Sequence, residues 1–181
     1  MTIKTYHVRW SQLKAFLLML IGTFTLNSCI PGIYGFKGTN FDPNIETFYV
    51  HPFELRANSA PPTITQTMEE GLKLKIRQES SIDENDTQPD IEFKGRVTRF
   101  ESRPQAPEAG EAIGFNRLTI AIEIEYIDNF HDDEKYNWKQ TFSRFEDFGE
   151  AVNLLDVQDE LIDVITQQIY EDIFNKAFTD W

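Results

Sequence analysis

Few side chains in this sequence are of the types that carry out chemistry, and Cys29 is the most distinctive of them. It is the only cysteine in 181 residues, so it cannot form a disulfide within the chain. Beyond it lie two histidines, His51 and His131, on separate predicted loops. The sequence has no glycine-rich phosphate loop, no GxSxG elbow and no HExxH pair. We therefore predict that the protein is not an enzyme and has no catalytic residues.

Four carboxylates and His131 crowd the stretch 128–134. Oxygen donors at this density raise the question of a calcium loop. An EF-hand loop that began at Asp128 would need glycine at its sixth position and glutamate at its twelfth. The chain has Asp133 and Lys139 at those positions. We therefore expect a solvated turn there, with no metal ligands and no cofactor.

The apolar run 15–26 decides where the chain is sent. Basic residues precede it, and no acidic residue occurs before Cys29, which is the charge order of a secretory signal. A membrane-spanning helix needs roughly 20 apolar residues, and this run is shorter. The pattern predicts a cleavable signal over residues 1–28.

The end of that run, Leu26-Asn27-Ser28-Cys29, resembles the lipobox of bacterial lipoproteins. Leu26, Ser28 and Cys29 match, whereas Asn27 is larger and more polar than is usual there. The resemblance implies covalent attachment of N-acyl and S-diacylglycerol lipid at Cys29. A chance cysteine beside an ordinary signal-peptidase site is the alternative. The residues after Cys29 include no acidic run, which favours a periplasm-facing anchor in the outer membrane.

The chain that would remain after cleavage is strongly acidic. Removing residues 1–28 removes three basic residues and no acidic one, which takes the formal net charge from −13 to −16. Such a surface repels nucleic acid and anionic bilayers. We therefore expect no nucleic-acid partner, and we expect the acyl chains to supply the membrane attachment.

The elements that follow predict a single domain over residues 45–181, joined to the anchor by a lipidated tether over 29–44. Side-chain periodicity predicts strands in the segments 45–51, 91–98, 117–126 and 136–143 and helices over 63–79 and 154–178. A Pro/Ala/Glu-rich loop is expected at 103–111. The order β-α-β-β-β-α predicts an α/β (α+β) two-layer sandwich, with a mostly antiparallel four-stranded sheet packed against two helices.

Several segments of the chain together resemble the LptE family of lipopolysaccharide-assembly lipoproteins. They are GIYGFKG at 32–38, FNRLTI at 115–120, FSRFEDF at 142–148 and EDIFNKAFTDW at 171–181. The resemblance implies an outer-membrane lipoprotein that plugs an LptD-type β-barrel, assists its assembly and supports lipopolysaccharide delivery to the outer leaflet. A periplasmic lipoprotein of similar architecture that binds a ligand or inhibits an enzyme is the alternative.

Four cations fall on the polar side of the strand alternation. They are Lys94, Arg96, Arg117 and Lys139. On one sheet face they could contact the phosphates of lipopolysaccharide or acidic groups of the barrel wall. The alternative is cross-strand pairing with Glu92, Glu123 and Glu125.

Overall fold

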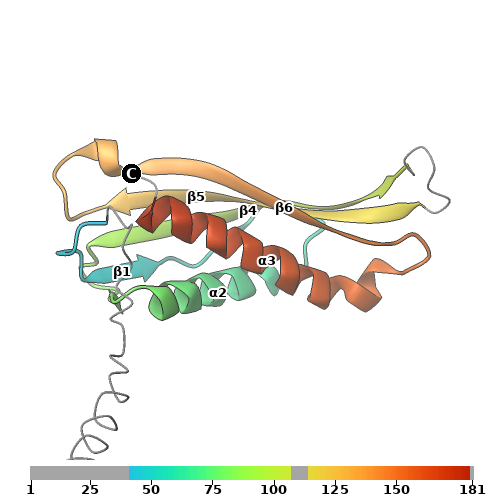
Figure 1. Cartoon of the computed structure of the whole chain (residues 1–181), viewed down its shortest axis with the longest axis horizontal. Helices are drawn as coiled ribbons and strands as arrows, with labels where there is room; N and C mark the ends of the chain where they lie inside the picture. Colours follow the sequence, from blue (N-terminus) through green and yellow to red (C-terminus); the bar gives the residue numbers. More distant parts are fainter. Residues whose placement is uncertain (1–40, 107–113, 180–181) are drawn as a thin grey trace, which may run out of the picture. The chain divides into compact units, whose positions relative to one another are not determined.

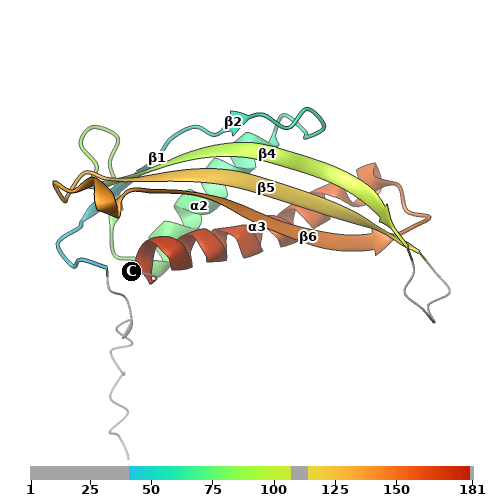
Figure 2. The same cartoon turned by 90° about the horizontal axis from the view of Figure 1, so that it is seen from above.

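Three long strands, β4 (Ile91–Gln105), β5 (Phe115–Asp128) and β6 (Trp138–Gly149), form the centre of the domain (Figure 1). The computed structural model describes residues 41–106 and 114–179. The remaining elements are β1 (Thr47–Val50), β2 (Glu54–Leu55), α2 (Ile64–Glu79), β3 (Asp83–Glu84), η2 (Glu134–Tyr136) and α3 (Leu154–Phe178). Both helices lie on one side of the arched sheet (Figure 2). The predicted two-layer sandwich is therefore confirmed. Neither helix has a stretch long and apolar enough to span a bilayer, within the described part of the chain.

The sheet has the order β3-β1-β4-β5-β6, with β2 beside β4. The β4–β5 and β5–β6 pairs are antiparallel, as predicted. Two details differ from the prediction: β2 and β3 add two-residue strands, and β1 pairs parallel to β4. The parallel pairing follows from α2, because a crossover helix lets the chain return to the sheet in the same direction.

One stripe of α2 faces the core, as its spacing predicts. The four side chains of the stripe, Ile64, Met68, Leu72 and Ile76, are each at most 1% exposed. Thr63 occupies the N-cap position, but its side chain makes no capping hydrogen bond. Packing, and not a side-chain cap, therefore holds the start of this helix.

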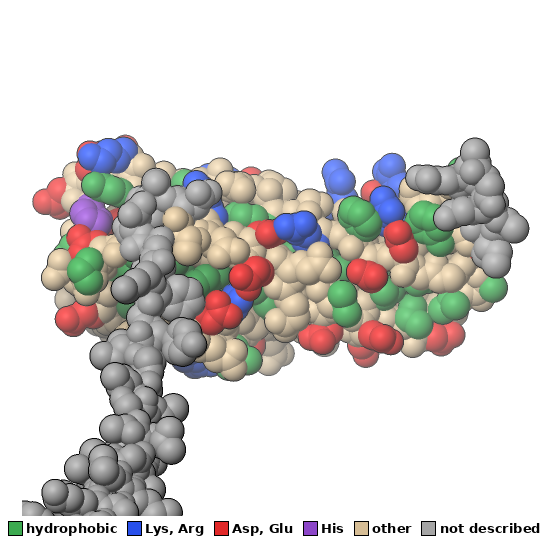
Figure 3. All heavy atoms as spheres, in the orientation of Figure 1, with side chains coloured by type: hydrophobic (Ala, Val, Ile, Leu, Met, Phe, Trp, Pro, Cys, Tyr) green, Lys and Arg blue, Asp and Glu red, His purple; other side chains and the backbone are tan. Residues whose placement is uncertain are grey.

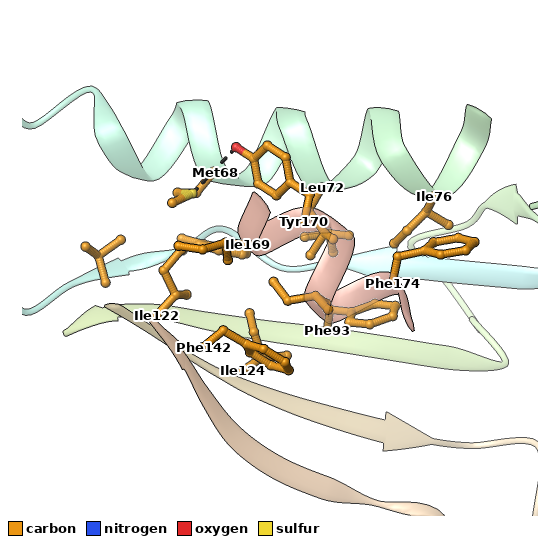
Figure 4. Close-up of a cluster of buried hydrophobic side chains, with 14 of the residues drawn as sticks. Met68, Leu72, Ile76, Phe93, Ile122, Ile124, Phe142, Ile169, Tyr170 and Phe174 are labelled. Carbon is orange, nitrogen blue, oxygen red and sulfur yellow. Dashed lines mark hydrogen bonds between the residues drawn. The ribbon is translucent and has the colours of Figure 1, made fainter. Parts of the chain in front are cut away.

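Gly71 marks the closest approach of the two helices. A Cβ placed there would overlap the ring of Tyr170 on α3, whose hydroxyl donates to the Thr67 carbonyl at 3.0 Å. Figure 4 shows the Tyr170 ring directed at α2 beside Met68 and Leu72. The glycine costs helix propensity, and the close packing of Tyr170 is its structural reason.

The helix α3 runs over the same residues as predicted, but its buried stripe differs in part. The apolar spacing of the helix predicts Val164 on its core-facing stripe, but Val164 is 40% exposed, because Leu161, Ile165 and Ile169 already occupy the sheet-facing side. Phe174 and Phe178 are 2% exposed, so both aromatic side chains pack in the core. Trp181 lies outside the described residues.

β4 continues to Gln105 and so extends into the predicted loop. Its ladder with β5 shifts register between Val97 and Arg99, which leaves Thr98 as the extra residue of a β-bulge. The buried positions change from Val97 to Phe100 across this point. Residues 107–113 of the predicted loop lie outside the described residues.

Candidate interaction surface

The side of the sheet turned away from the helices, here called the outer sheet face, holds all four predicted cations. Lys94 pairs in register with Glu125, which in turn pairs with Lys139. Arg96 stands opposite Glu123. Arg117 lies farther along β5, opposite Asp147. The structure therefore brings three of the cations together and places Arg117 toward the far end of the same face.

Carboxylates hold two of these cations across the strands, which is the arrangement of the pairing alternative. Glu123 Oε1 accepts from Arg96 Nη1 at 2.6 Å and lies 3.1 Å from Lys139 Nζ. Arg96 also lies near Glu54 and Glu125, at 3.4 Å and 3.8 Å. The hydrogen bond from Arg96, and then that from Lys139, lowers the pKa of Glu123. The group remains charged and fixes both cations on the outer sheet face.

Arg117 has a different environment, built from β6. Its Nε and Nη2 donate to the two carboxylate oxygens of Asp147 at 2.7 Å and 2.9 Å. Its guanidinium carbon lies 3.7 Å from the centre of the Phe145 ring, and Phe145 is 48% exposed. The hydrogen bond that Arg117 donates to Asp147 raises the pKa of Arg117. A planar guanidinium suits this combination of bidentate pairing and ring stacking.

Lys94 is the cation with the least fixed head group. Among the described residues it makes no ion pair within 4.0 Å. Burial opposes ionisation of Glu92, but hydrogen bonds with His51 and Asn129 lower its pKa, and the charge of Lys94 adds a smaller lowering. A shallow hollow of about 350 Å³ lies nearby and is lined by Glu125, Tyr126, Ile127, Asn137, Trp138 and Lys139. Lys94 is thus the cation of the set that an external anion can bind with the smallest loss of ion pairing within the chain.

The sequence did not lead us to predict two further basic residues on the outer sheet face. Arg99 and Arg103 point outward because the bulge at Thr98 shifts the alternation by one residue. Arg103 pairs with Glu101 at 2.7 Å and is 71% exposed. The spacing of the apolar residues in β4 could have indicated the bulge. Phe100 follows Val97 by three residues, whereas a regular strand places apolar residues at every second position.

Figure 3 shows that charge is distributed unevenly over the surface. Lys and Arg side chains follow the upper margin of this view, and Asp and Glu side chains gather along the lower right. α3 exposes four carboxylates in its first half: Asp156, Asp159, Glu160 and Asp163. On the face that Figure 3 shows, cations and carboxylates therefore occupy different margins.

The turn after β5 was predicted to be solvated, and for Asp128 that is wrong. The Asp128 side chain is 0% exposed. Its oxygens accept from the backbone amides of Phe130 and His131 at 3.0 Å and 2.8 Å, and one lies 2.9 Å from His131 Nδ1. Local backbone donors explain the burial, because they satisfy a carboxylate that water no longer reaches.

His131 joins this turn to the start of the described chain. Its Nε2 lies 3.4 Å from Asp42 Oδ2, and its ring stacks on Tyr136 with 4.3 Å between centroids. The hydrogen bond to Asp128, with a smaller contribution from Asp42, raises the pKa of His131. Within residues 41–106 and 114–179, no three His, Cys, Asp or Glu side chains are grouped so as to hold a metal ion.

The predicted lipid-attachment residue, Cys29, lies outside the described residues, so its lipidation stays a prediction. The same holds for the signal over 1–28. Part of the predicted tether is described, and it already contacts the domain. Phe41 packs against Phe178 with 4.7 Å between ring centroids.

Comparison with known proteins gives a family and several distant structural likenesses. No sequence among the curated proteins matches the chain. A minor lipoprotein from Acinetobacter baumannii is 17% identical, with a TM-score of 0.43 over 74% of this chain and 94% of its own. An uncharacterized lipoprotein B from Nitrosomonas europaea is 12% identical, with a TM-score of 0.42 over 71% and 79%. These likenesses carry no argument of their own.

A putative neuraminyllactose-binding hemagglutinin homolog from Helicobacter pylori is similar at the same level, with 11% identity and a TM-score of 0.43 over 80% of this chain and 91% of its own.

The decisive finding is the match of residues 45–177 to the family model described as LptE, lipopolysaccharide-assembly. That range includes every described helix and strand except the last residue of α3. The chain therefore belongs to the LptE family of lipopolysaccharide assembly.

Proposed function

We propose that this protein is an outer-membrane lipoprotein that plugs an LptD-type β-barrel, assists its assembly and supports lipopolysaccharide delivery to the outer leaflet. The observation that carries the proposal is the family match over residues 45–177. The folded part of the chain that it covers is a two-layer domain of one core, which is a shape that can fill a lumen without a catalytic site.

The outer sheet face supplies the candidate contacts for lipopolysaccharide or for acidic groups of the barrel wall. Arg96 and Arg117 are held in place by carboxylates, so they present ordered cations at little further entropic cost. Lys94 has the freer ammonium group, and Lys139 is paired with Glu123 but remains 48% exposed. Both lysines suit a phosphate as point charges. Rigid guanidinium groups would therefore position an anion, and the two lysines would neutralise it.

Cys29 provides the membrane attachment in this proposal. A diacylglycerol and an N-acyl chain give the two or more apolar anchors that stable membrane attachment needs. Residues 1–28 act as the signal, 29–44 as the tether and 45–181 as the domain. The contact of Phe41 with Phe178 supports a short connection, because the domain already holds the chain before residue 45.

Purification of the full chain in mild detergent tests the partner. A large outer-membrane β-barrel should co-purify near one to one, and depletion of the chain should lower the amount of assembled barrel. A Cys29→Ala variant should lose membrane attachment while the domain stays folded. Recovery of the wild-type chain without any barrel would remove the plug proposal.

A second experiment tests the cations. The variant Lys94→Gln, Arg96→Gln, Arg117→Gln and Lys139→Gln should lose lipopolysaccharide binding or barrel association. A matched control changes four cations away from the outer sheet face to glutamine: Arg56, Arg77, Lys135 and Lys176. Unchanged binding in the first variant, or an equal loss in both, would contradict the proposed contacts.

A further inference from the structure

β6 forms one margin of the sheet, and its outer edge pairs with no strand of residues 41–106 and 114–179. The opposite margin is the two-residue strand β3. An edge exposes a row of backbone N–H and C=O groups that can pair with another strand, and proteins usually block it with a short strand, a proline or a bulge. β6 spans Trp138–Gly149, contains no proline, and pairs with β5 without a register shift. This edge is therefore long and open.

The sequence of β6 is complementary to itself when two copies run antiparallel about Ser143. In that register Lys139 of each copy stands opposite Asp147 of the other. Trp138 stands opposite Phe148, which adds an aromatic pair at each end. The remaining opposite pairs are Gln140 with Glu146, Thr141 with Phe145, and Phe142 with Arg144. No two like charges meet, and directly opposite side chains are the ones that stabilise a sheet.

The ion pairs on the outer sheet face extend this complementarity beyond the two edges. Asp147 is bound to Arg117 within its own chain, and Lys139 is bound to Glu123. Across the junction of the two copies, the side chains follow the order Arg117 on β5 and Asp147 on β6 of one copy, then Lys139 on β6 and Glu123 on β5 of the second copy. Positive and negative charges therefore alternate across four strands on one face. The two-fold axis generates a second series of the same kind.

We infer that a second copy of this chain binds along β6, so that the two sheets join into one continuous antiparallel sheet. The occupant follows from the charge pattern, because Lys139 and Asp147 stand opposite each other under two-fold symmetry and the other charged residues of β6, Arg144 and Glu146, meet uncharged side chains. The inference rests on the edge alone, and it concerns the chain outside a barrel, because a copy enclosed as a plug has no room for a second copy along β6.

Other two-fold registers fit less well. An axis at Phe142 places Lys139 opposite Phe145, and an axis at Arg144 places two guanidinium groups opposite each other. An axis at Phe145 pairs only residues 141–149 and leaves Lys139 unused. The axis at Ser143 combines the longest paired segment with opposite charges at both ends.

Charge reversal tests the pairing in full chains that carry two different tags, are expressed together, are purified in mild detergent and are separated from barrel-bound chain. The parent copies should co-purify. Lys139→Asp alone and Asp147→Lys alone should each lower self-association at least tenfold, because both charge pairs then become repulsive. The two single variants expressed together should recover it, since both pairs are again opposite.

Lys135→Asp is the matched control, because it makes the same charge change in η2 and should leave self-association unchanged. Recovery by the mixed variants shows that each chain still folds. The inference is overturned if the parent copies do not co-purify, or if the mixed variants associate no better than either variant alone.

Oxidative cross-linking tests the register. Ser143→Cys should give a disulfide-linked dimer, because the two residues face each other at the axis. Thr141→Cys and Phe145→Cys are controls that should not cross-link beyond the parent level, and Cys29 is common to all three variants. A dimer formed through position 145 and not 143, or no dimer with any variant, would overturn the register.

Discussion

The two ends of the sheet differ in where they place charged groups: one end buries a carboxylate, and the other keeps an ion pair at the surface. At the end where β5 meets η2, Asp128 is buried and fixed by two backbone amides and His131. At the other end, Arg117 and Asp147 pair on the surface beside an exposed Phe145. A buried carboxylate commits the local backbone to one arrangement, whereas a surface pair leaves the strands free to meet a partner. We infer that the buried Asp128 stabilises the fold at the η2 end and that the Arg117–Asp147 pair at the far end serves as contact surface only.

Truncating an aromatic side chain at each end should give the largest difference. Phe178 packs against Phe41, Phe93 and Phe174, so Phe178→Ala should destabilise the domain by about 3–5 kcal/mol. Phe145→Ala should stay within about 0.5 kcal/mol of the parent. Urea unfolding of both variants gives the comparison. Equal losses of unfolding free energy in the two variants would show that both ends of the sheet contribute equally to stability.

Neutralising a carboxylate at each end should give a smaller but still clear difference. Asp128→Asn replaces an acceptor with a donor beside His131 and should cost about 1–3 kcal/mol, because buried polar groups then lose partners. Asp147→Asn should leave the unfolding midpoint within measurement error, since its partner is at the surface. A larger loss of unfolding stability for Asp147→Asn than for Asp128→Asn would mean that the far end, and not the η2 end, stabilises the fold.

A change of pH should affect only the η2 end through His131. Its pKa is raised from 6.5 by Asp128 and, to a lesser extent, Asp42. A group with a raised folded-state pKa contributes its full stability below about 6.5 and loses it as pH rises through the folded value. The parent should therefore lose more stability than His131→Gln between pH 6 and pH 9.

The measurement is the unfolding midpoint of each variant across that pH range. If His131→Gln showed the same pH dependence as the parent, the imidazole would not be the responsible group.

The smallest effect is expected from Arg117→Lys, which keeps the charge and loses both the bidentate geometry and the stacking on Phe145. The unfolding midpoint should not change, because the pair lies at the surface. Self-association through β6 should fall only slightly, since a lysine still neutralises Asp147. A strong loss of stability would mean that the far end is more rigid than its exposure indicates.

Periodicity predicted most of this fold because each element has one clear apolar side. The stripe from Ile64 to Ile76 and the alternation in β5 follow directly from burial. Asp128 could not be predicted to be buried, because its partners are backbone amides of the following turn. The pairing of Arg117 with Asp147 depended on the β5–β6 register, and the outward direction of Arg99 depended on the bulge. Tertiary geometry decided these features.

The bulge at Thr98 affects the bend of β4 but not the choice of side chains on each face of the sheet. Thr98 is the extra residue between Val97 and Arg99, and a bulge bends and twists its strand. Deleting it should leave the same side chains on each face, because the residues on both sides already follow one register with β5. The strand would become straighter. One residue thus bends β4 without changing which side chains reach the outer sheet face.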